Sequence, residues 1–140
     1  LVDLEGGKPI PITPEGIAGG LISPDGRYVI RDVEVGSKFL AVCPVEGGPA
    51  RPIPNLGPYF AAIRWSEDNS FVYGFFRNRV PTELYKVNLA TGTKSLLQEL
   101  QPESAGVVYI SPVVVTPDGS RSAFTYRQVS SVLSVVSGLH

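Results

Sequence analysis

The sequence predicts an all-β fold made of short antiparallel strands. A four-residue turn motif occurs three times, and its copies begin 43 and then 50 residues apart. A β-prone run follows each copy, and no segment sustains the 3.6-residue apolar period of an amphipathic helix. The 13 prolines and 15 glycines also interrupt the chain too often for long helices. Because the spacing is close to the length of one four-stranded propeller blade, we expect about three four-stranded antiparallel blades, a partial β-propeller.

The turn motif has a physical reason at each of its positions. Ser or Thr at the first position bonds backbone within the turn, and Pro fixes φ at the second. Gly, or Asn in the middle copy, accepts the left-handed conformation that closes the turn. Asp25 and Asp118 are therefore expected to stabilise turns rather than to act as general acids or bases. The three copies are Ser23-Pro24-Asp25-Gly26, Ser66-Glu67-Asp68-Asn69 and Thr116-Pro117-Asp118-Gly119.

The remaining strands follow in phase with the turns. The run after each turn predicts a second strand, over residues 27–30, 70–76 and 122–126. A third alternating run follows about 15 residues beyond each turn, over residues 39–45, 83–89 and 132–136. A fourth follows a hairpin signal, over residues 50–53 and 94–97. Residues 94–100 are the best helix candidate, but they are few and fall where the repeat requires an outer strand.

These phases divide the chain into one partial and three nearly complete blades. Residues 1–15 read as the outer strands of a preceding blade, and residues 16–57 and 58–103 as two full blades. Residues 104–140 read as a last blade that lacks its outer strand. A start at Leu1 inside a strand-like pattern predicts the C-terminal part of a longer protein. The apolar end faces of such a fragment predict further blades upstream or self-association, with residues 8–12 supplying the missing strand.

Composition and charge argue against several function classes. Hydrophobic residues make up 43% of the chain and charged residues 18%, and the net charge is −1. Neither the basic nor the acidic residues form a cluster, so we expect no nucleic-acid binding and no membrane contact by this segment. Cys43 is the only cysteine and is expected to be a small buried side chain. The only histidine is His140, so the chain offers no catalytic triad or multi-histidine metal site. With no phosphate-binding loop either, we expect no enzyme activity, cofactor or metal.

A candidate binding face lies where longer loops gather at one end of the blades. Arg and Tyr are favoured anchors at binding surfaces, because they combine directional hydrogen bonding with rigid contact area. The alternative is that such arginines are solvated or stacked on a neighbouring blade. Trp65, on an inner strand, is expected to pack between blades rather than to stack on a ligand. The candidate binding residues are Tyr59, Arg77, Arg79, Tyr109 and Arg127.

Two levels of resemblance follow from these motifs. Ser-Pro-Asp-Gly followed by aromatic and β-branched residues resembles the WD40-like (TolB-type, PD40) propeller repeats. Residues 51–139 are similar to the C-terminal propeller of acidobacterial serine/threonine protein kinases, although acidic residues of that pattern are missing near the C-terminus. The motifs that carry this similarity are Arg51-Pro52-Ile53-Pro54, Ile63-Arg64-Trp65-Ser66, Leu84-Tyr85-Lys86-Val87-Asn88-Leu89-Ala90-Thr91-Gly92, Val114-Val115-Thr116-Pro117-Asp118-Gly119, Phe124-Thr125-Tyr126, Val129-Ser130-Ser131-Val132-Leu133 and Val136-Ser137-Gly138-Leu139.

The resemblance implies a non-catalytic module that binds a protein or a small ligand. In the kinase-linked group it would form the sensor or scaffold end of a bacterial signalling protein. The alternative is a TolB-like periplasmic interaction propeller, or the propeller domain of an S9-type peptidase. The cellular location stays open, with the extracytoplasmic or periplasmic side favoured.

Overall fold

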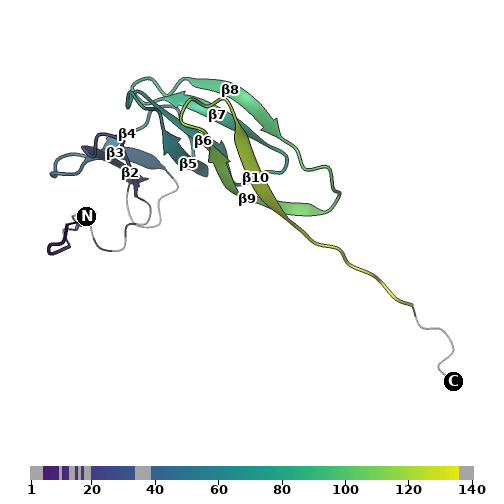
Figure 1. Ribbon diagram of the computed structural model, residues 1–140. Coiled ribbons are helices and arrows are strands. Elements are labelled where there is room, and N and C mark those ends of the chain that lie inside the picture. The colour runs from purple at the N-terminus through teal and green to yellow at the C-terminus, as the bar shows by residue number, and fades with distance from the viewer. Residues whose placement is uncertain are drawn as a thin grey trace.

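The computed structural model describes residues 5–9, 11–12, 15, 17, 20–33 and 39–135. These residues form ten strands in three antiparallel sheets, and none of them lies in a helix. The all-β prediction is therefore confirmed for the described part of the chain. Figure 1 shows the sheets next to one another in chain order, with the C-terminal segment running away from them. The search for membrane-spanning helices in the described residues also finds none.

The first sheet contains four strands in chain order. They are β1 (Leu21–Ile22), β2 (Tyr28–Asp32), β3 (Leu40–Pro44) and β4 (Arg51–Pro52). The central strands β2 and β3 are rich in β-branched residues and are largely buried, whereas β4 is exposed. Of residues 1–15, the structure describes 5–9, 11–12 and 15, and none of these is in a strand.

The second sheet also contains four strands, and burial decreases from its middle to its outer edge. The strands are β5 (Phe60–Trp65), β6 (Phe71–Phe76), β7 (Thr82–Asn88) and β8 (Lys94–Leu100). Four consecutive residues of β6 are buried, so this strand is covered on both faces. In β8 only Leu100 is buried. The expected outer strand over residues 94–97 is confirmed and is three residues longer than predicted.

The third sheet contains only two strands, β9 (Val107–Val115) and β10 (Ser122–Gln128). The strand predicted over residues 132–136 is wrong for residues 132–135, which are exposed and outside any strand; Val136 lies outside the described residues. The reason is local turn chemistry. Only Val129, Ser130 and Ser131 separate β10 from the predicted strand, and none of them is a Gly, Asn, Asp or Pro that would close a short hairpin.

The three turn motifs adopt one hydrogen-bonded structure, as the sequence predicts. In each copy the first-position hydroxyl donates to the Asp carboxylate. The same hydroxyl oxygen accepts the backbone N–H five residues later, at 2.9 Å in the first copy and 3.0 Å in the others. Each Asp carboxylate also accepts the N–H two residues later, at 3.1 Å. The carboxylates are therefore acceptors within the turns.

These hydrogen bonds predict how stability depends on pH. The Thr116 hydroxyl, followed by the Ser120 N–H, lowers the pKa of Asp118 from 3.8 to about 2. The hydroxyls of Ser23 and Ser66 similarly lower the pKa of Asp25 and Asp68. A carboxyl whose pKa is lower in the folded chain stabilises the fold above its unfolded pKa, and this contribution is lost as pH falls through the folded pKa.

The free energy of unfolding should therefore fall as pH drops from about 4 to about 2, and fall less steeply in the Asp118→Asn variant. Asparagine keeps a side-chain oxygen acceptor but does not titrate in this range. Urea unfolding curves at several pH values across this window would measure both slopes. Identical slopes for the two proteins would contradict the assignment to Asp118.

Two cores hold the sheets together. The first inter-sheet core lies between the first and second sheets, and its buried members are Ile30, Val42, Ile53, Leu56, Phe60, Trp65, Val72, Val87 and Leu89. The second inter-sheet core joins the second sheet to the third through Ala61, Tyr73, Phe75, Leu84, Leu100, Ile110, Val113 and Val115. The indole N–H of Trp65 donates to the Leu21 carbonyl at 2.8 Å, so the expected packing role of Trp65 is confirmed.

A smaller core covers the other face of the first sheet. Val29, Ala41 and Cys43 are buried there, and Ile12 packs against them. Burial raises the pKa of the Cys43 thiol, with the Arg31 charge acting in the opposite direction. Cys43 is thus a buried apolar residue, as expected from its neighbours in the sequence.

Candidate binding face

Tyr59 and Arg77 lie together at one end of the second sheet. Tyr59 directly precedes β5 and Arg77 directly follows β6, and the antiparallel pairing of these strands brings the two residues to the same end. The Arg77 N–H donates to the Tyr59 carbonyl at 3.0 Å. Tyr59 has φ 67°, a left-handed conformation that is uncommon for a residue with a bulky side chain. Such backbone geometry persists where surrounding contacts hold it.

Tyr109 and Arg127 lie together at the corresponding end of the third sheet, but in strands rather than in loops. The expectation that both occupy loops is wrong: Tyr109 belongs to β9, Arg127 belongs to β10, and they are direct cross-strand partners. Val107 and Val108 are β-branched and extend β9 toward Gly106. The Val129 N–H then donates to the Gly106 carbonyl at 3.0 Å and continues the pairing beyond Arg127.

The two Tyr–Arg pairs lie at the same sequence distances from their turn motifs. Tyr109 follows Tyr59 by 50 residues and Arg127 follows Arg77 by 50 residues, the same spacing that separates the last two turn motifs. The tyrosines are also exposed to a similar extent, 40% for Tyr59 and 42% for Tyr109. The fold therefore presents the same Tyr–Arg combination twice, from adjacent sheets. We call these four residues the Tyr–Arg face.

Arg79, the fifth predicted residue, is engaged within its own sheet. Its guanidinium pairs with the Glu83 carboxylate at 2.6 Å and lies over the Phe76 ring, 4.9 Å from the ring centroid. Glu83 also accepts a hydrogen bond from the Tyr85 hydroxyl. These contacts hold the connection between β6 and β7, which carries Arg77, and Arg79 thus supports the Tyr–Arg face.

A hollow of about 270 Å³ lies beside Arg77, between the first and second sheets. Asp32 and Arg31 line it from the end of β2, and Phe60 and Leu40 provide apolar walls. Arg31 is 9% exposed, and its Nη1 donates to the backbone carbonyls of Asp32 and Val33. The hollow therefore combines apolar walls with charged groups of both signs, which suits a ligand that has polar and apolar parts.

Comparison with profiles of known protein families and with curated protein sequences finds no match.

Arg64 marks a second surface, which the sequence reasoning missed. It stands two residues before the middle turn motif, where the other two copies have Leu21 and Val114. A charge that interrupts an apolar repeat position is the signal that could have identified it. Its Nη1 donates to the Val115 carbonyl at 3.4 Å, and the side chain lies between hollows of about 380 and 350 Å³. Glu67 lines the larger hollow and Arg121 the smaller one.

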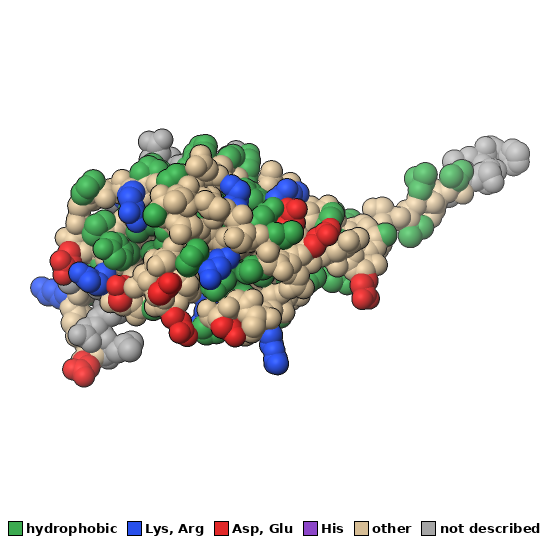
Figure 2. Space-filling view, turned by 90° about the horizontal axis from the view of Figure 1, so that it is seen from above, with side chains coloured by type: hydrophobic (Ala, Val, Ile, Leu, Met, Phe, Trp, Pro, Cys, Tyr) green, Lys and Arg blue, Asp and Glu red, His purple; other side chains and the backbone are tan. Residues whose placement is uncertain are grey.

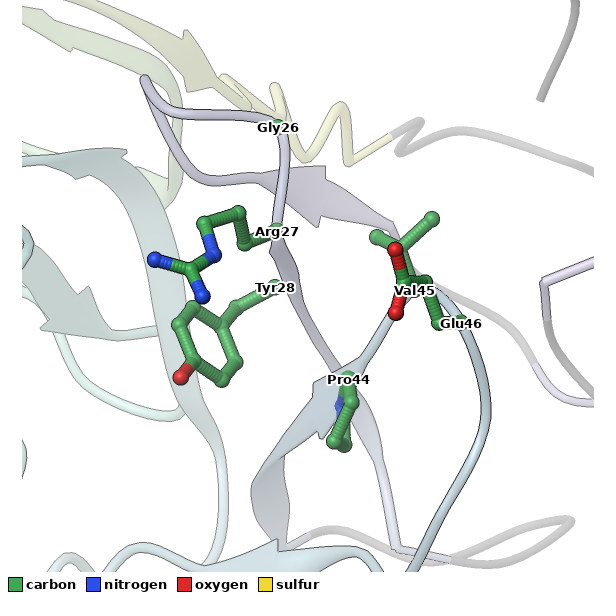
Figure 3. Close-up of a pocket in the computed structure, with 6 residues that line it drawn as sticks. All are labelled: Gly26, Arg27, Tyr28, Pro44, Val45 and Glu46. Carbon is green, nitrogen blue, oxygen red and sulfur yellow. The ribbon is translucent and has the colours of Figure 1, made fainter.

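The hollow drawn in Figure 3 lies where β2 begins and β3 ends. Its volume is about 390 Å³. Its charged groups do not converge. The figure shows Arg27 and Tyr28 extending to one side of the strand, with Glu46 on the other side. A volume without converging polar groups is a weak site for a specific ligand.

The titratable side chains of the described residues show two further features. The search for three grouped His, Cys, Asp or Glu side chains able to hold a metal ion finds none among them. The three aspartates with a lowered pKa are acceptors inside turns. His140 lies outside the described residues.

Proposed function

We propose that this chain is a non-catalytic β-propeller module that binds a protein or a small ligand through the Tyr–Arg face. The observation that carries the proposal is the repetition of the pair: Tyr59 with Arg77 in the second sheet, and Tyr109 with Arg127 in the third. Two adjacent sheets that present the same anchors at the same end form a surface suited to an extended partner.

The propeller arrangement is supported by how the sheets meet. In the first two sheets the strands follow chain order from one edge to the other, as they do in a propeller blade. Each junction between neighbouring sheets is a face-to-face apolar core. The residue that follows the turn motif by four positions faces the next sheet in both junctions, Ile30 in the first and Tyr73 in the second.

The chemistry of the Tyr–Arg face indicates the kind of ligand. Each guanidinium can hold a carboxylate through two parallel hydrogen bonds, and each tyrosine offers a rigid apolar ring with a polar tip. The neighbouring hollow adds the apolar walls of Phe60 and Leu40. An acidic peptide segment with apolar side chains is the partner that fits these groups best.

Selection of a random peptide library on the immobilised chain would test this role. Peptides enriched on the wild type should bind about 30-fold more weakly to Arg77→Ala or Arg127→Ala, the loss expected when a binding anchor worth about 2 kcal/mol is removed. Arg121→Ala removes the same charge from the smaller hollow beside Arg64 and is the matched control; binding should stay unchanged. A library without enriched peptides, or equal binding by all three variants, would argue against the Tyr–Arg face.

We also propose that the module is the C-terminal sensor or scaffold part of a bacterial serine/threonine kinase-like protein, on the strength of the resemblance over residues 51–139. The test is the reading frame upstream of the codon for Leu1. A Gly-rich loop, a strand lysine and a His-Arg-Asp catalytic loop in that frame would support a kinase. An export signal followed only by further blades would instead indicate a TolB-like periplasmic protein.

A further inference from the structure

The third sheet ends in an unpaired strand edge. In the first two sheets the strand after the turn motif, β2 or β6, is paired on both sides. In the third sheet the equivalent strand is β10, and it pairs only with β9. Its seven residues, Ser122–Gln128, therefore present a row of backbone donors and acceptors without a strand partner in the described part of the chain.

An exposed apolar segment follows directly on this edge. Residues 129–135 are described but are not in a strand. Val132 is 92% exposed, Leu133 91% and Val135 85%. In Figure 1 the segment extends away from the sheets, and Figure 2 shows hydrophobic side chains along the same projection. Four of its seven residues are Val or Leu, which are compatible with a strand.

The segment and the edge cannot pair easily within one molecule. The hydrogen bond from Val129 to the Gly106 carbonyl keeps the backbone in the direction of β10. A return along β10 would need a tight reversal over Val129, Ser130 and Ser131. Three-residue hairpin loops normally use a left-handed residue such as Gly, and none of these three residues is a Gly.

Few of the features that normally prevent edge pairing are present in these two elements. Residues 129–135 contain no charged residue and no proline, and β10 contains one charge, Arg127, near its end. Natural edge strands are usually protected by charges, prolines or bulges. The two register irregularities inside β10, between Phe124 and Tyr126 and between Arg127 and Gln128, both concern its pairing with β9.

We propose that the segment of residues 129–135 from one copy of this chain adds as a strand to the β10 edge of a second copy, reciprocally, to form a two-fold dimer. Each copy supplies one edge and one segment, so a single symmetric interface satisfies both. The edge and the segment can pair with each other, but the residues between them do not form the turn that pairing within one chain requires. Such an arrangement favours strand exchange between copies.

Strand addition would also extend the second inter-sheet core. Phe124 packs partly buried against that core, and Tyr126 lies opposite Ile110 and is 42% exposed. Alternate side chains of an added strand would lie beside these rings. Leu133 and Val135 share one face of a strand, and Val132 lies on the other, so the side chains on the face of these rings would lose water contact on pairing.

Sedimentation equilibrium of the whole chain, over a wide concentration range, tests the proposal. The wild type should show a monomer–dimer equilibrium. In the Val132→Lys/Leu133→Lys double variant the dissociation constant of the dimer should rise by roughly tenfold or more, because two charges would enter the new strand. Both side chains are exposed in the monomer, so the fold should persist, which far-ultraviolet circular dichroism would verify.

The control is the Leu96→Lys/Leu97→Lys variant, which makes the same change on β8, the open edge of the second sheet. Leu96 and Leu97 are 60% and 40% exposed. This variant should dimerise like the wild type. Hydrogen exchange adds a local readout: amides of β10 and of residues 130–135 should exchange more slowly in the dimer. A wild type that stays monomeric, a dimer weakened equally by both variants, or unchanged exchange in β10 would overturn the proposal.

Discussion

Replacing Trp65 with alanine is expected to destabilise the fold by about 3–5 kcal/mol, the range for removing a large aromatic side chain from a core. Trp65 is 3% exposed and lies in the first inter-sheet core. Its loss would leave a cavity between the first and second sheets and an unpaired carbonyl at Leu21, the indole's hydrogen-bond acceptor. Since domains of this kind are stable by only about 5–15 kcal/mol, the first sheet is expected to loosen from the second.

Trp65→Phe separates the two contributions of the side chain. The smaller ring keeps most of the packing but cannot donate to the Leu21 carbonyl, so a loss of about 1–2 kcal/mol is expected. Urea unfolding followed by far-ultraviolet circular dichroism is the suitable measurement, because Trp65 is the only tryptophan and both variants remove its fluorescence. A loss below about 1 kcal/mol in Trp65→Ala would contradict the core position.

The second large effect is expected from Gly92→Ala, in the hairpin between β7 and β8. Gly92 has φ +72°, and a Cβ added there would overlap the Pro54 carbonyl group. The hairpin is also bonded to the neighbouring connection: the Lys94 ammonium donates to the Asn55 carbonyl at 2.6 Å. In the variant an alanine must adopt a left-handed backbone conformation, and the hairpin must move away from Pro54 to make room for the Cβ. We expect a loss of about 3 kcal/mol.

Gly26→Ala is the matched control for this prediction. Gly26 has the same φ of +72°, but an added Cβ would have no atom within 4 Å. Only the backbone contribution should remain, about 1 kcal/mol. Urea unfolding of both variants measures the difference, which reports the steric contribution at Pro54. Equal losses would show that the hairpin can move away from Pro54 without cost.

Features set by short-range chemistry could be predicted from the sequence. Each turn motif closes on its own hydroxyl and carboxylate, so its structure follows from four to six consecutive residues. The strands next to these turns follow because β-branched and aromatic residues start directly after them. The packing role of Trp65 could also be predicted, because a large aromatic residue on an inner strand needs a neighbouring sheet to cover it.

The errors concern places where a partner decides the outcome. The sequence predicts loops at Tyr109 and Arg127, but the two residues are cross-strand partners. Local propensity does not show at which residue the pairing of two strands ends. The run at residues 132–136 has the composition of a strand, yet a strand also needs a turn that returns it to its neighbour. The surface at Arg64 could not be predicted from local sequence, because its guanidinium contacts the Val115 carbonyl of the third sheet, 51 residues away.

The double burial of β6 has a mechanical consequence. Val72 contributes to the first inter-sheet core, while Tyr73 and Phe75 contribute to the second. Close-packed interiors are stiff and transmit displacement, so β6 cannot shift toward one core without disturbing the other. Arg77 follows β6 directly in the chain. A force that a partner applies to the Arg77 guanidinium would therefore act on a strand that packs against both neighbouring sheets. That force would be transmitted to all three sheets.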